Sequence, residues 1–387
     1  MPIIKSDGSI YQRQTDKKWV ASIVIGKKDN GRPDRKVFYG NSEREVRNKL
    51  KAYKAEMAKY SHGNTVRMDV ASFMRDWLHN DLALTLKPKS YDSKEYTIEK
   101  LVIPLIGSYQ VASLTREDIQ KMVKTLSQKY ARSSVKRAYD AVNQCFKKAM
   151  IDQRLYENPC YGVTIPRERE ENIKEIRFFT QDEMDRILNA AEATYPTGTK
   201  ICRLGAAIHL LYYTGLRAGE ALALTWDDID FKNKLIYVGK NVVNVKNRSD
   251  GAGVNEPKYV TVIQKSTKTK SGKRPVPISA KAESALNELK QINGDCNYVL
   301  ATSSGKPMSI RAFEKMFHGC QNRAGIVEHG TLHSLRHTFA SRLLENGVDV
   351  KIVSEILGHK DVTITYNTYI HIIKQQKMKA VQQLDLL

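Results

Sequence analysis

The first sixty residues change from the alternating pattern of strands to the spacing of a helix. Three β-prone runs, separated by short polar turns, predict three short strands around Ile10, Trp19–Ile25 and Val37–Tyr39. Ser42 and Glu45 then stand at capping-box spacing, and apolar residues follow at intervals of three and four. We therefore expect residues 1–60 to form a small module in which one helix packs on a three-stranded sheet.

A long region of helical periodicity comes next. Apolar residues recur at intervals of three and four in the segments VASFMRDWL, TREDIQKMVKTLSQKY and SVKRAYDAVNQCFKKAMID. Thr115 and Asp118 form a second capping-box pattern. These features predict an all-helical domain over residues 65–166. Between Asn158-Pro159 and Arg177, the sequence GVTIPREREENIKEIR has Pro166, alternating charges and almost no apolar periodicity, which is typical of an interdomain linker.

The remainder, residues 176–387, mixes helical segments with a strand-rich middle. Thr180 and Glu183 begin another capped helix, and β-prone runs follow over residues 234–278. The polar stretch VKNRSDGAGVNEPK between two of these runs predicts an unusually long hairpin. The expected fold class is thus multidomain α+β: a small sheet with one helix, an all-helical middle domain and a mixed α/β third domain.

The net charge of the chain indicates what kind of partner it binds. The chain carries 63 Lys and Arg against 42 Asp and Glu, a formal net charge of +21, for which nucleic acid is the leading counterpart. Residues 1–64 hold 15 basic and 7 acidic residues, a net charge of +8, so this module is a candidate DNA-binding domain; a merely solvated sheet face is the alternative. The candidate contacts lie on the third strand and in the helical domain, at Arg35, Tyr39, Arg132 and Lys136.

Apolar content and cysteine usage limit the class of protein further. Apolar residues make up 41% of the chain, too many for a disordered basic tail. No window approaches about eighteen consecutive apolar residues, and the N-terminal MPIIKSDGSIYQ becomes polar too early for a secretory signal. The five cysteines are scattered without a CxxC pair, which argues against a disulfide framework or a zinc ribbon. We therefore expect a cytoplasmic protein without a membrane segment.

The first of three segments with reactive side chains is LLYYTGLRAGEALALTWDDID. An apolar helix is predicted to end at Gly215, and Arg217 follows it directly. Glu220 stands at i+3, where its carboxylate can hold the Arg217 guanidinium in place. Taken alone, this pattern favours a surface ion pair that contributes little.

The other two segments are HSLRHTFASRLLENG and ILGHKDVTITYNTYIHI. His333 and Arg336 share one helical face, with His337 one turn from His333. Two histidines at this spacing could bind a metal, but HExxH is absent and no carboxylate is placed to complete a zinc site. In the last segment His359 lies in the turn after a helix, and Tyr369 follows ten residues later.

This set of residue types suits phosphoryl transfer. Such chemistry asks a protein to position the phosphate and to neutralise charge on its non-bridging oxygens, and two guanidiniums do both. A tyrosine hydroxyl can serve as the nucleophile, a histidine can take its proton, and a cation can protonate the leaving oxygen. A phosphodiester could then be cleaved without a metal, and its bond energy would be kept in a phosphotyrosine.

The strings TGLRAGE, HSLRHTFAS and LGHKDVTITYNTYIH resemble the motif boxes of the tyrosine recombinases of the phage or lambda-integrase type. Their order and spacing match that family, and the basic module and helical domain match the three-part build of integrases from phages and integrative conjugative elements. The resemblance implies a site-specific DNA recombinase that integrates and excises a mobile element through a 3′-phosphotyrosine, with no metal, ATP or other cofactor.

The resemblance also implies roles for the matching residues. Arg217 and Arg336 would clamp the scissile phosphate, and Glu220 would orient Arg217. His333 would accept a proton or bind the phosphate. His359 would hold the phosphate and the nucleophile in place.

The nucleophile and the general acid complete the implied site. Tyr369 would attack the phosphate and leave a free 5′-hydroxyl; Tyr366 is a competing position, but the interval from His359 favours Tyr369. The family uses a hairpin lysine to protonate the leaving oxygen, and Lys268 in KSTKTKSGKRPVPIS is our choice. A shift of register would replace it with one of its neighbours Lys265, Lys270 and Lys273, and a lysine cluster that only contacts phosphates is the alternative.

The resemblance finally assigns partners to each part of the chain. Residues 1–60 would bind arm-type sites, residues 65–166 and 176–387 would bind core sites of double-stranded DNA, and four copies would assemble in synapsis, with an excisionase as a further partner. A type IB topoisomerase and a DNA-binding regulator without activity are the alternatives.

The C-terminal segment is predicted to form an amphipathic helix that docks on a neighbouring protomer or packs on its own domain, through Ile372, Ile373, Met378, Val381 and Leu384.

Overall fold

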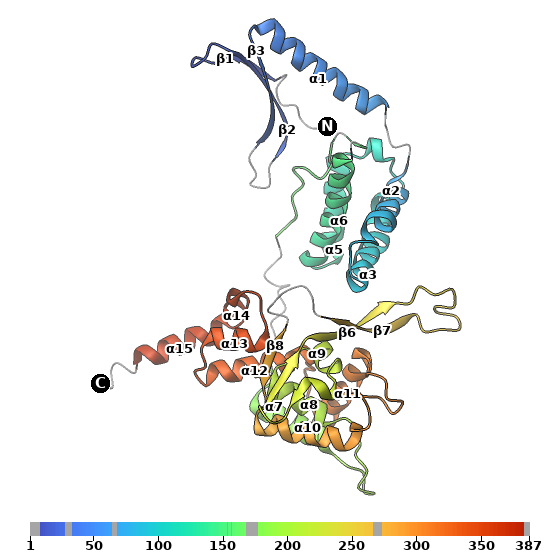
Figure 1. Ribbon diagram of the computed structural model, residues 1–387, viewed down its shortest axis with the longest axis vertical. Helices are drawn as coiled ribbons and strands as arrows, with labels where there is room; N and C mark the ends of the chain where they lie inside the picture. The colour runs from blue at the N-terminus through green and yellow to red at the C-terminus, as the bar shows by residue number, and fades with distance from the viewer. Residues whose placement is uncertain are drawn as a thin grey trace. The chain divides into compact units, whose positions relative to one another are not determined.

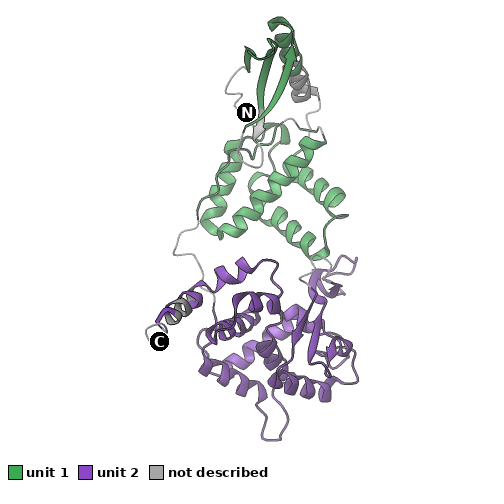
Figure 2. Cartoon of the chain, turned by 60° about the vertical axis from the view of Figure 1, so that its left-hand side comes forward, with its two compact units in different colours: residues 1–173 green, residues 174–387 purple. Residues whose placement is uncertain are grey.

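The structure is a computed structural model of the 387-residue chain (Figure 1). It describes residues 8–27, 33–63, 68–152, 154–155, 157–167, 177–265 and 273–382. The chain divides into two compact units, residues 1–173 and 174–387 (Figure 2). The division falls within the segment that the sequence predicts as a linker.

The N-terminal part has the predicted sheet and helix. Strands β1 (Ser9–Gln12), β2 (Trp19–Lys27) and β3 (Pro33–Gly40) form an antiparallel sheet in the order β1-β2-β3, and α1 (Glu43–Gly63) follows. The helix and the sheet share a small apolar core of Ala21, Ile23, Val46 and Leu50. The predicted capping box is only half formed: the Ser42 hydroxyl accepts from the Glu45 N–H, but the Glu45 carboxylate accepts from the N–H of Asn41.

The second part of the first unit is all-helical, as predicted. Its helices are α2 (Val70–Trp77), α3 (Pro88–Thr97), α4 (Ile103–Ile106), α5 (Arg116–Lys129) and α6 (Arg132–Ile151). Short π-helical turns at residues 78–82 and 98–102 extend α2 and α3. Phe73, Met74 and Phe146 lie in its core, which is separate from that of the sheet. Thr115 and Asp118 form the predicted capping box at the start of α5.

The second unit contains the remaining helices and strands. Its helices are α7 (Gln181–Glu192), α8 (Ala206–Thr214), α9 (Ala218–Leu222), α10 (Ala280–Asn293), α11 (Ile310–Arg323), α12 (Leu332–Glu345), α13 (Val350–Leu357), α14 (Val362–Thr368) and α15 (Ile370–Gln382). Helix α8 is apolar on nearly all sides and is therefore buried at the centre of this unit. The predicted capping box of Thr180 and Glu183 is present at α7.

The strands of the second unit form two small antiparallel sheets. Strands β4 (Ile229–Asp230), β5 (Leu235–Val238) and β8 (Arg274–Pro277) form one sheet in that order, and β6 (Lys240–Lys246) pairs with β7 (Tyr259–Lys265) in the other. The β6–β7 pair is the long hairpin expected from the sequence, because residues 247–258 connect its strands (Figure 1). The mixed α/β character of the third predicted domain is thus confirmed.

Two further expectations concern cysteines and membranes. All five cysteines are free thiols, and four of them are buried. Among the residues that the structure describes, no helix is both long and apolar enough to cross a membrane.

The C-terminal helix α15 begins directly after Tyr369 and packs in part on its own domain. Ile372 and Ile373 are buried, and Ile372 belongs to the apolar cluster of Leu344, Val353 and Leu357. Farther along, Met378 and Val381 are each 65% exposed, whereas Leu384 lies outside the described residues. The first turn of the helix therefore packs in cis.

Candidate active site

Arg217 is held at the junction of two helices. Gly215 ends α8 in the left-handed conformation at φ 63°, and Arg217 occupies the N-cap position of α9. Its guanidinium Nη1 donates to Oε1 of Glu220 at 2.7 Å, and its backbone N–H donates to Oε2 at 2.9 Å. The side chain remains 38% exposed, so the guanidinium is fixed on one side and open to a ligand on the other.

Glu220 also binds Arg274, which had no role in the sequence-based hypothesis. Nη1 and Nη2 of Arg274 donate to Oε1 and Oε2 at 3.1 and 2.9 Å, and both side chains are buried. Burial alone would raise the pKa of Glu220, but the hydrogen bonds and charge of Arg274, together with Arg217, lower it to about 2. One ionised carboxylate is therefore shared by two arginines.

Arg336 lies on α12 and is almost completely buried, with 2% of its surface exposed. Nη1 donates to the Gly215 carbonyl at 2.9 Å, and Nη2 donates to the Leu357 carbonyl at 2.6 Å and to Nε2 of His359 at 3.0 Å. Burial, followed by the charge of Arg217, lowers the pKa of Arg336 to about 9, so the group is still cationic at neutral pH. Arg336 joins the C-terminal ends of α8 and α13.

The C-terminal end of α13 receives three arginines on consecutive carbonyls. Arg274 Nε donates to the carbonyl of Ile356 at 2.6 Å, Arg336 to Leu357 at 2.6 Å, and Arg217 Nη2 to Gly358 at 3.5 Å. The last carbonyls of a helix lack intrahelical partners and carry partial negative charge, so they suit cationic donors. This helix end thereby gathers the arginines around one point.

His359 follows this helix end directly. Gly358 adopts φ 67° and ends α13, as the sequence predicts. Because Arg336 can only donate, Nε2 of His359 accepts, and Nδ1 carries the proton and donates to the Thr365 hydroxyl at 2.7 Å. Burial and the charges of Arg336 and Arg217 lower the pKa of His359 to about 4. The imidazole is therefore neutral and of one tautomer.

His333 lies one turn before Arg336 on α12, and its side chain is exposed. Partial burial of the ring, with the charges of Arg336 and Arg217, lowers its pKa. The rings of His333 and His337 meet edge to face, with centroids 4.5 Å apart. In the described part of the chain, no three His, Cys, Asp or Glu side chains form a group that could hold a metal ion.

Tyr369 stands apart from the arginines in its hydrogen bonding. It is 2% exposed, within the apolar cluster of Ala340, Leu344 and Leu357, and its hydroxyl is hydrogen-bonded to Nδ1 of His337 at 2.8 Å. Burial raises the pKa of Tyr369, so the hydroxyl is protonated at neutral pH. The sequence suggested His359 as the partner of Tyr369 and left His337 without a role. The position of His337 next to Arg336 was the sequence feature that could have pointed to it.

The predicted lysine lies outside the described residues, as does Lys270. Of its alternatives, Lys265 ends β7 and Lys273 immediately precedes β8. Both line a hollow of about 540 Å³, together with Lys240 and Asp228, which form an ion pair of 2.6 Å. The assignment of Lys268 therefore stays a prediction.

The predicted DNA contacts are exposed or engaged locally. Tyr39 is 50% exposed on the same face of β3 as the exposed Arg35, and the Arg13 guanidinium lies 5.5 Å from the Tyr39 ring centroid. In the helical part, Arg132 Nε donates to the carbonyl of Pro166 at 3.2 Å, and Lys136 pairs with Asp140 at 2.8 Å within α6.

Known proteins match the chain over both of its units. Residues 177–376 match the phage integrase family, and residues 70–127 match the SAM-like N-terminal domain of phage integrases. A tyrosine recombinase XerC-like protein of Caldanaerobacter subterraneus is 29% identical and covers 97% of each chain. An integrase of Streptomyces ambofaciens is 23% identical and covers 94% of this chain and 92% of its own.

Solved structures confirm the fold. The integrase of transposon Tn1549, in complex with a circular intermediate DNA, superposes with a TM-score of 0.65 at 20% identity, over 81% of this chain and 99% of its own. A lambda integrase dimer bound to a COC′ core site gives a TM-score of 0.59 at 19% identity, over 93% of each chain. The family match spans more than half of the sequence and includes every motif that carries the site. The chain therefore belongs to the phage integrase family and is a tyrosine recombinase, an enzyme of site-specific DNA recombination.

Proposed function

We propose that this recombinase integrates and excises a mobile element by cutting and rejoining DNA through a 3′-phosphotyrosine. The observation that carries the proposal is the convergence of Arg217, Arg336 and His359 at the end of α13, fixed by buried hydrogen bonds. Donors held in place before the substrate arrives can stabilise the charge that develops on a phosphate in the transition state. The Tn1549 and lambda integrases, whose folds this chain shares, support the choice of a mobile element.

Each residue then has a role in one transesterification. Arg217 and Arg336 bind the non-bridging oxygens, and Glu220 orients Arg217. The Tyr369 oxygen attacks phosphorus, the bond from phosphorus to the 5′-oxygen breaks, and a 3′-phosphotyrosine forms. His333 accepts the tyrosine proton or binds the phosphate.

Protonation of the leaving oxygen completes the step. We assign this proton to Lys268 and note that its alternatives Lys265 and Lys273 flank the same segment. Neutral His359 positions the phosphate through the hydrogen bond with Arg336. The energy of the phosphodiester stays in the phosphotyrosine, so rejoining needs neither ATP nor a metal, and adduct formation in excess EDTA tests this directly.

The other parts of the chain bind DNA away from the phosphate that is cleaved. We assign arm-type sites to residues 1–60 through Arg35 and Tyr39, and core sites to residues 65–166 through Arg132 and Lys136 and to residues 176–387. A lambda integrase tetramer on a Holliday junction shares this fold and supports a tetramer in synapsis. An excisionase that sets the direction of recombination, and action in the cytoplasm, belong to the same proposal.

A covalent adduct with a nicked core-site duplex tests the nucleophile. The nick releases the 5′-hydroxyl strand, so the phosphotyrosine accumulates and is resolved on a denaturing gel. Tyr369→Phe should abolish the adduct and leave DNA binding unchanged, because the substitution removes only the attacking oxygen. Tyr366→Phe is the matched control on the preceding turn and should form the adduct. An adduct in Tyr369→Phe would contradict the assignment.

A second assay separates recombination from simple relaxation. Two duplexes carrying core sites are incubated with the protein, and recombinant products are measured beside the relaxation of a plasmid that lacks the site. A site-specific recombinase should exchange strands between the duplexes. Relaxation without exchange would favour a topoisomerase instead.

A further inference from the structure

We propose that Arg274 is a positioning residue for strand cleavage, which holds Arg217 and His359 in register through Glu220 and the end of α13. The inference rests on the proposed function, because it concerns the same phosphate site. Arg274 is not expected to touch the phosphate: its side chain is 6% exposed, and its guanidinium faces Glu220 and Ile356.

The first contact of Arg274 controls Arg217. The two guanidinium nitrogens fork onto both oxygens of Glu220, and the same two oxygens accept from the side chain and backbone of Arg217. Four donors thus fix one carboxylate from two sides. A carboxylate held in this way has one orientation, and so does the exposed arginine that depends on it.

The second contact controls His359. Nε of Arg274 donates to the carbonyl of Ile356, three residues before His359, at 2.6 Å. The fit at this point is close, because a Cβ at Gly358 would lie 2.8 Å from Cδ of Arg274. Arg274 therefore sets the place of the helix end from which the carbonyls of Leu357 and Gly358 reach Arg336 and Arg217.

The place of Arg274 in the chain adds a third link. It begins β8, where it pairs with Val238 of β5, and it directly follows Lys273 and the lysine-rich segment of the sequence. A rigid fork connects β8 to both α9 and α13. The strand that leads out of the lysine segment is in this way joined to two of the phosphate-binding elements.

Rates of adduct formation in Arg274→Met and Arg274→Lys measure the effect. Misplacement of a catalytic group by about 1 Å can slow a reaction about 100-fold, and we expect this loss for Arg274→Met, with DNA binding unchanged. Lysine keeps the charge but cannot fork onto a carboxylate and reach a carbonyl as well, so Arg274→Lys should recover only part of the rate.

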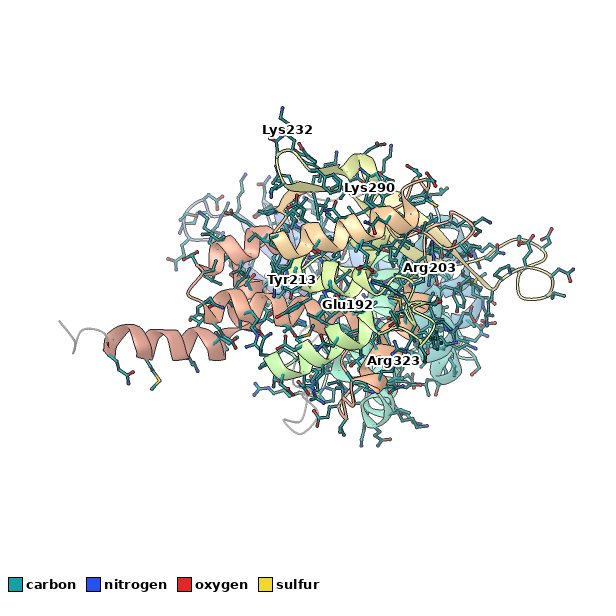
Figure 3. The ribbon with its side chains drawn as sticks, turned by 90° about the horizontal axis from the view of Figure 1, so that it is seen from below. Glu192, Arg203, Tyr213, Lys232, Lys290 and Arg323 are labelled. Carbon is teal, nitrogen blue, oxygen red and sulfur yellow. The ribbon has the colours of Figure 1, made fainter. Side chains whose placement is uncertain are left out.

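A matched control separates positioning from stability. Arg203, which is labelled in Figure 3, also donates inside this unit, to the carbonyl of Ala301 at 3.1 Å and to Asn293 at the end of α10 at 2.6 Å. Both partners lie outside the elements that carry the site residues named above. Arg203→Met should lower the melting temperature and leave the adduct rate per folded molecule unchanged.

The pH dependence of the adduct rate distinguishes positioning from a purely structural role, which would not change it. The charged groups that act on Glu220 are Arg217 of its own helix, Arg274 of β8 and Arg336 of α12. In the wild type the carboxyl stays ionised between pH 5.5 and 8.5 because its pKa is about 2. Loss of Arg274 raises that pKa, so Glu220 is protonated as the pH falls and Arg217 loses its partner. The ratio of the Arg274→Met rate to the wild-type rate should therefore fall as the pH is lowered.

A double-mutant cycle is completed by measuring the effect of Arg274→Met on the adduct rate in a Glu220→Gln background. If Arg274 acts through Glu220, Arg274→Met should change the rate of Glu220→Gln less than it changes the wild type, and the remaining ratio should not depend on pH. Full additivity, or a ratio in the wild-type background that does not change with pH, would overturn the inference.

Three further outcomes are decisive. If Arg274→Met melts below the assay temperature, Arg274→Lys decides, and a wild-type rate for it at every pH would overturn the inference. No adduct in the wild-type protein would contradict the proposed function and, with it, this inference. An adduct in the wild type with an unchanged rate in Arg274→Met would contradict the inference alone.

Discussion

The arginine side and the tyrosine side of the site are built differently. Arg217, Arg336 and His359 each take part in two or more side-chain hydrogen bonds, and the acceptors of the two arginines include carbonyls at two helix ends. Within the described residues, the Tyr369 side chain has one hydrogen bond, to His337, and its ring is buried among apolar side chains. The side proposed to bind the phosphate is thus held in place in the structure without DNA, whereas the proposed nucleophile is buried and protonated.

This difference indicates that cleavage would be controlled on the tyrosine side of the site. Charges that are positioned in advance need no rearrangement when the phosphate arrives. A buried hydroxyl with a raised pKa is a poor nucleophile until its surroundings change. Because α15 starts at the residue after Tyr369 and its first turn packs on the domain through Ile372, a change at this helix would act directly on the tyrosine side.

The largest expected effect is on the arginine side. Arg336→Met should slow adduct formation about 1000-fold or more, because it removes a transition-state cation and the link between the ends of α8 and α13. Single-turnover rates on the nicked duplex measure this loss. Arg342→Met on the same helix, where the arginine pairs with Glu345 at 2.8 Å, is the control and should cleave normally. A loss of less than tenfold in Arg336→Met would show that the arginine side is not decisive.

The next prediction tests whether this side depends on the glycine that ends α8. Gly215→Ala should lower the free energy of unfolding by about 3 kcal/mol, since alanine is strained at φ 63° and its Cβ would lie 2.3 Å from the Phe339 ring. Urea denaturation measures the change. Gly347 has φ 83° and open space around it, so Gly347→Ala should lose only the strain, about 1 kcal/mol. Equal losses would show that the contact with Phe339 contributes nothing.

A pH titration of stability probes both sides together. His359 on the arginine side and His337 on the tyrosine side have pKa values lowered to about 4, mainly by burial and also by the Arg336 charge. The unfolded chain takes up protons below about pH 6.5, so stability is complete above that pH and falls as the pH approaches 4. After allowing for partial exposure, we expect a loss of about 2 kcal/mol between pH 7 and pH 5.

Thermal melts across this range measure the effect. The variant His337→Gln/His359→Gln should show a much smaller slope between pH 7 and pH 5, because carboxylates account for stability changes mainly at lower pH. A slope equal to that of the wild type would mean that other groups cause the acid sensitivity.

Local sequence signals predicted much of this site, but they could not predict its long-range contacts. The helix ends at Gly215 and Gly358 and the pair of Arg217 and Glu220 depend on neighbours within a few residues, so they can be read from spacing. The contact of Arg274 with Glu220 spans 54 positions and depends on how β8 packs against α9, which no periodicity encodes.

The same limit applies to the tyrosine side. Tyr369 was identified from its distance along the chain to His359, but its hydrogen bond goes to His337, 32 residues upstream on α12. The packing of α12, α13 and α15 decides which of two nearby histidines meets the hydroxyl. Resemblance to a family names the nucleophile, and only the fold shows its partner.

The smallest predicted effect concerns that partner. His337→Ala leaves the hydroxyl of Tyr369 buried without its side-chain partner, which destabilises the buried position by about 1 to 3 kcal/mol. Since the arginine side is already in place, easier departure of the tyrosine should speed adduct formation by about fivefold under single-turnover conditions. His337→Asn keeps a hydrogen-bonding group at the same distance along the side chain as Nδ1 and should stay near the wild-type rate. A slower reaction in His337→Ala would instead mean that the imidazole assists the attack, and the tyrosine side would then be as preorganised as the arginine side.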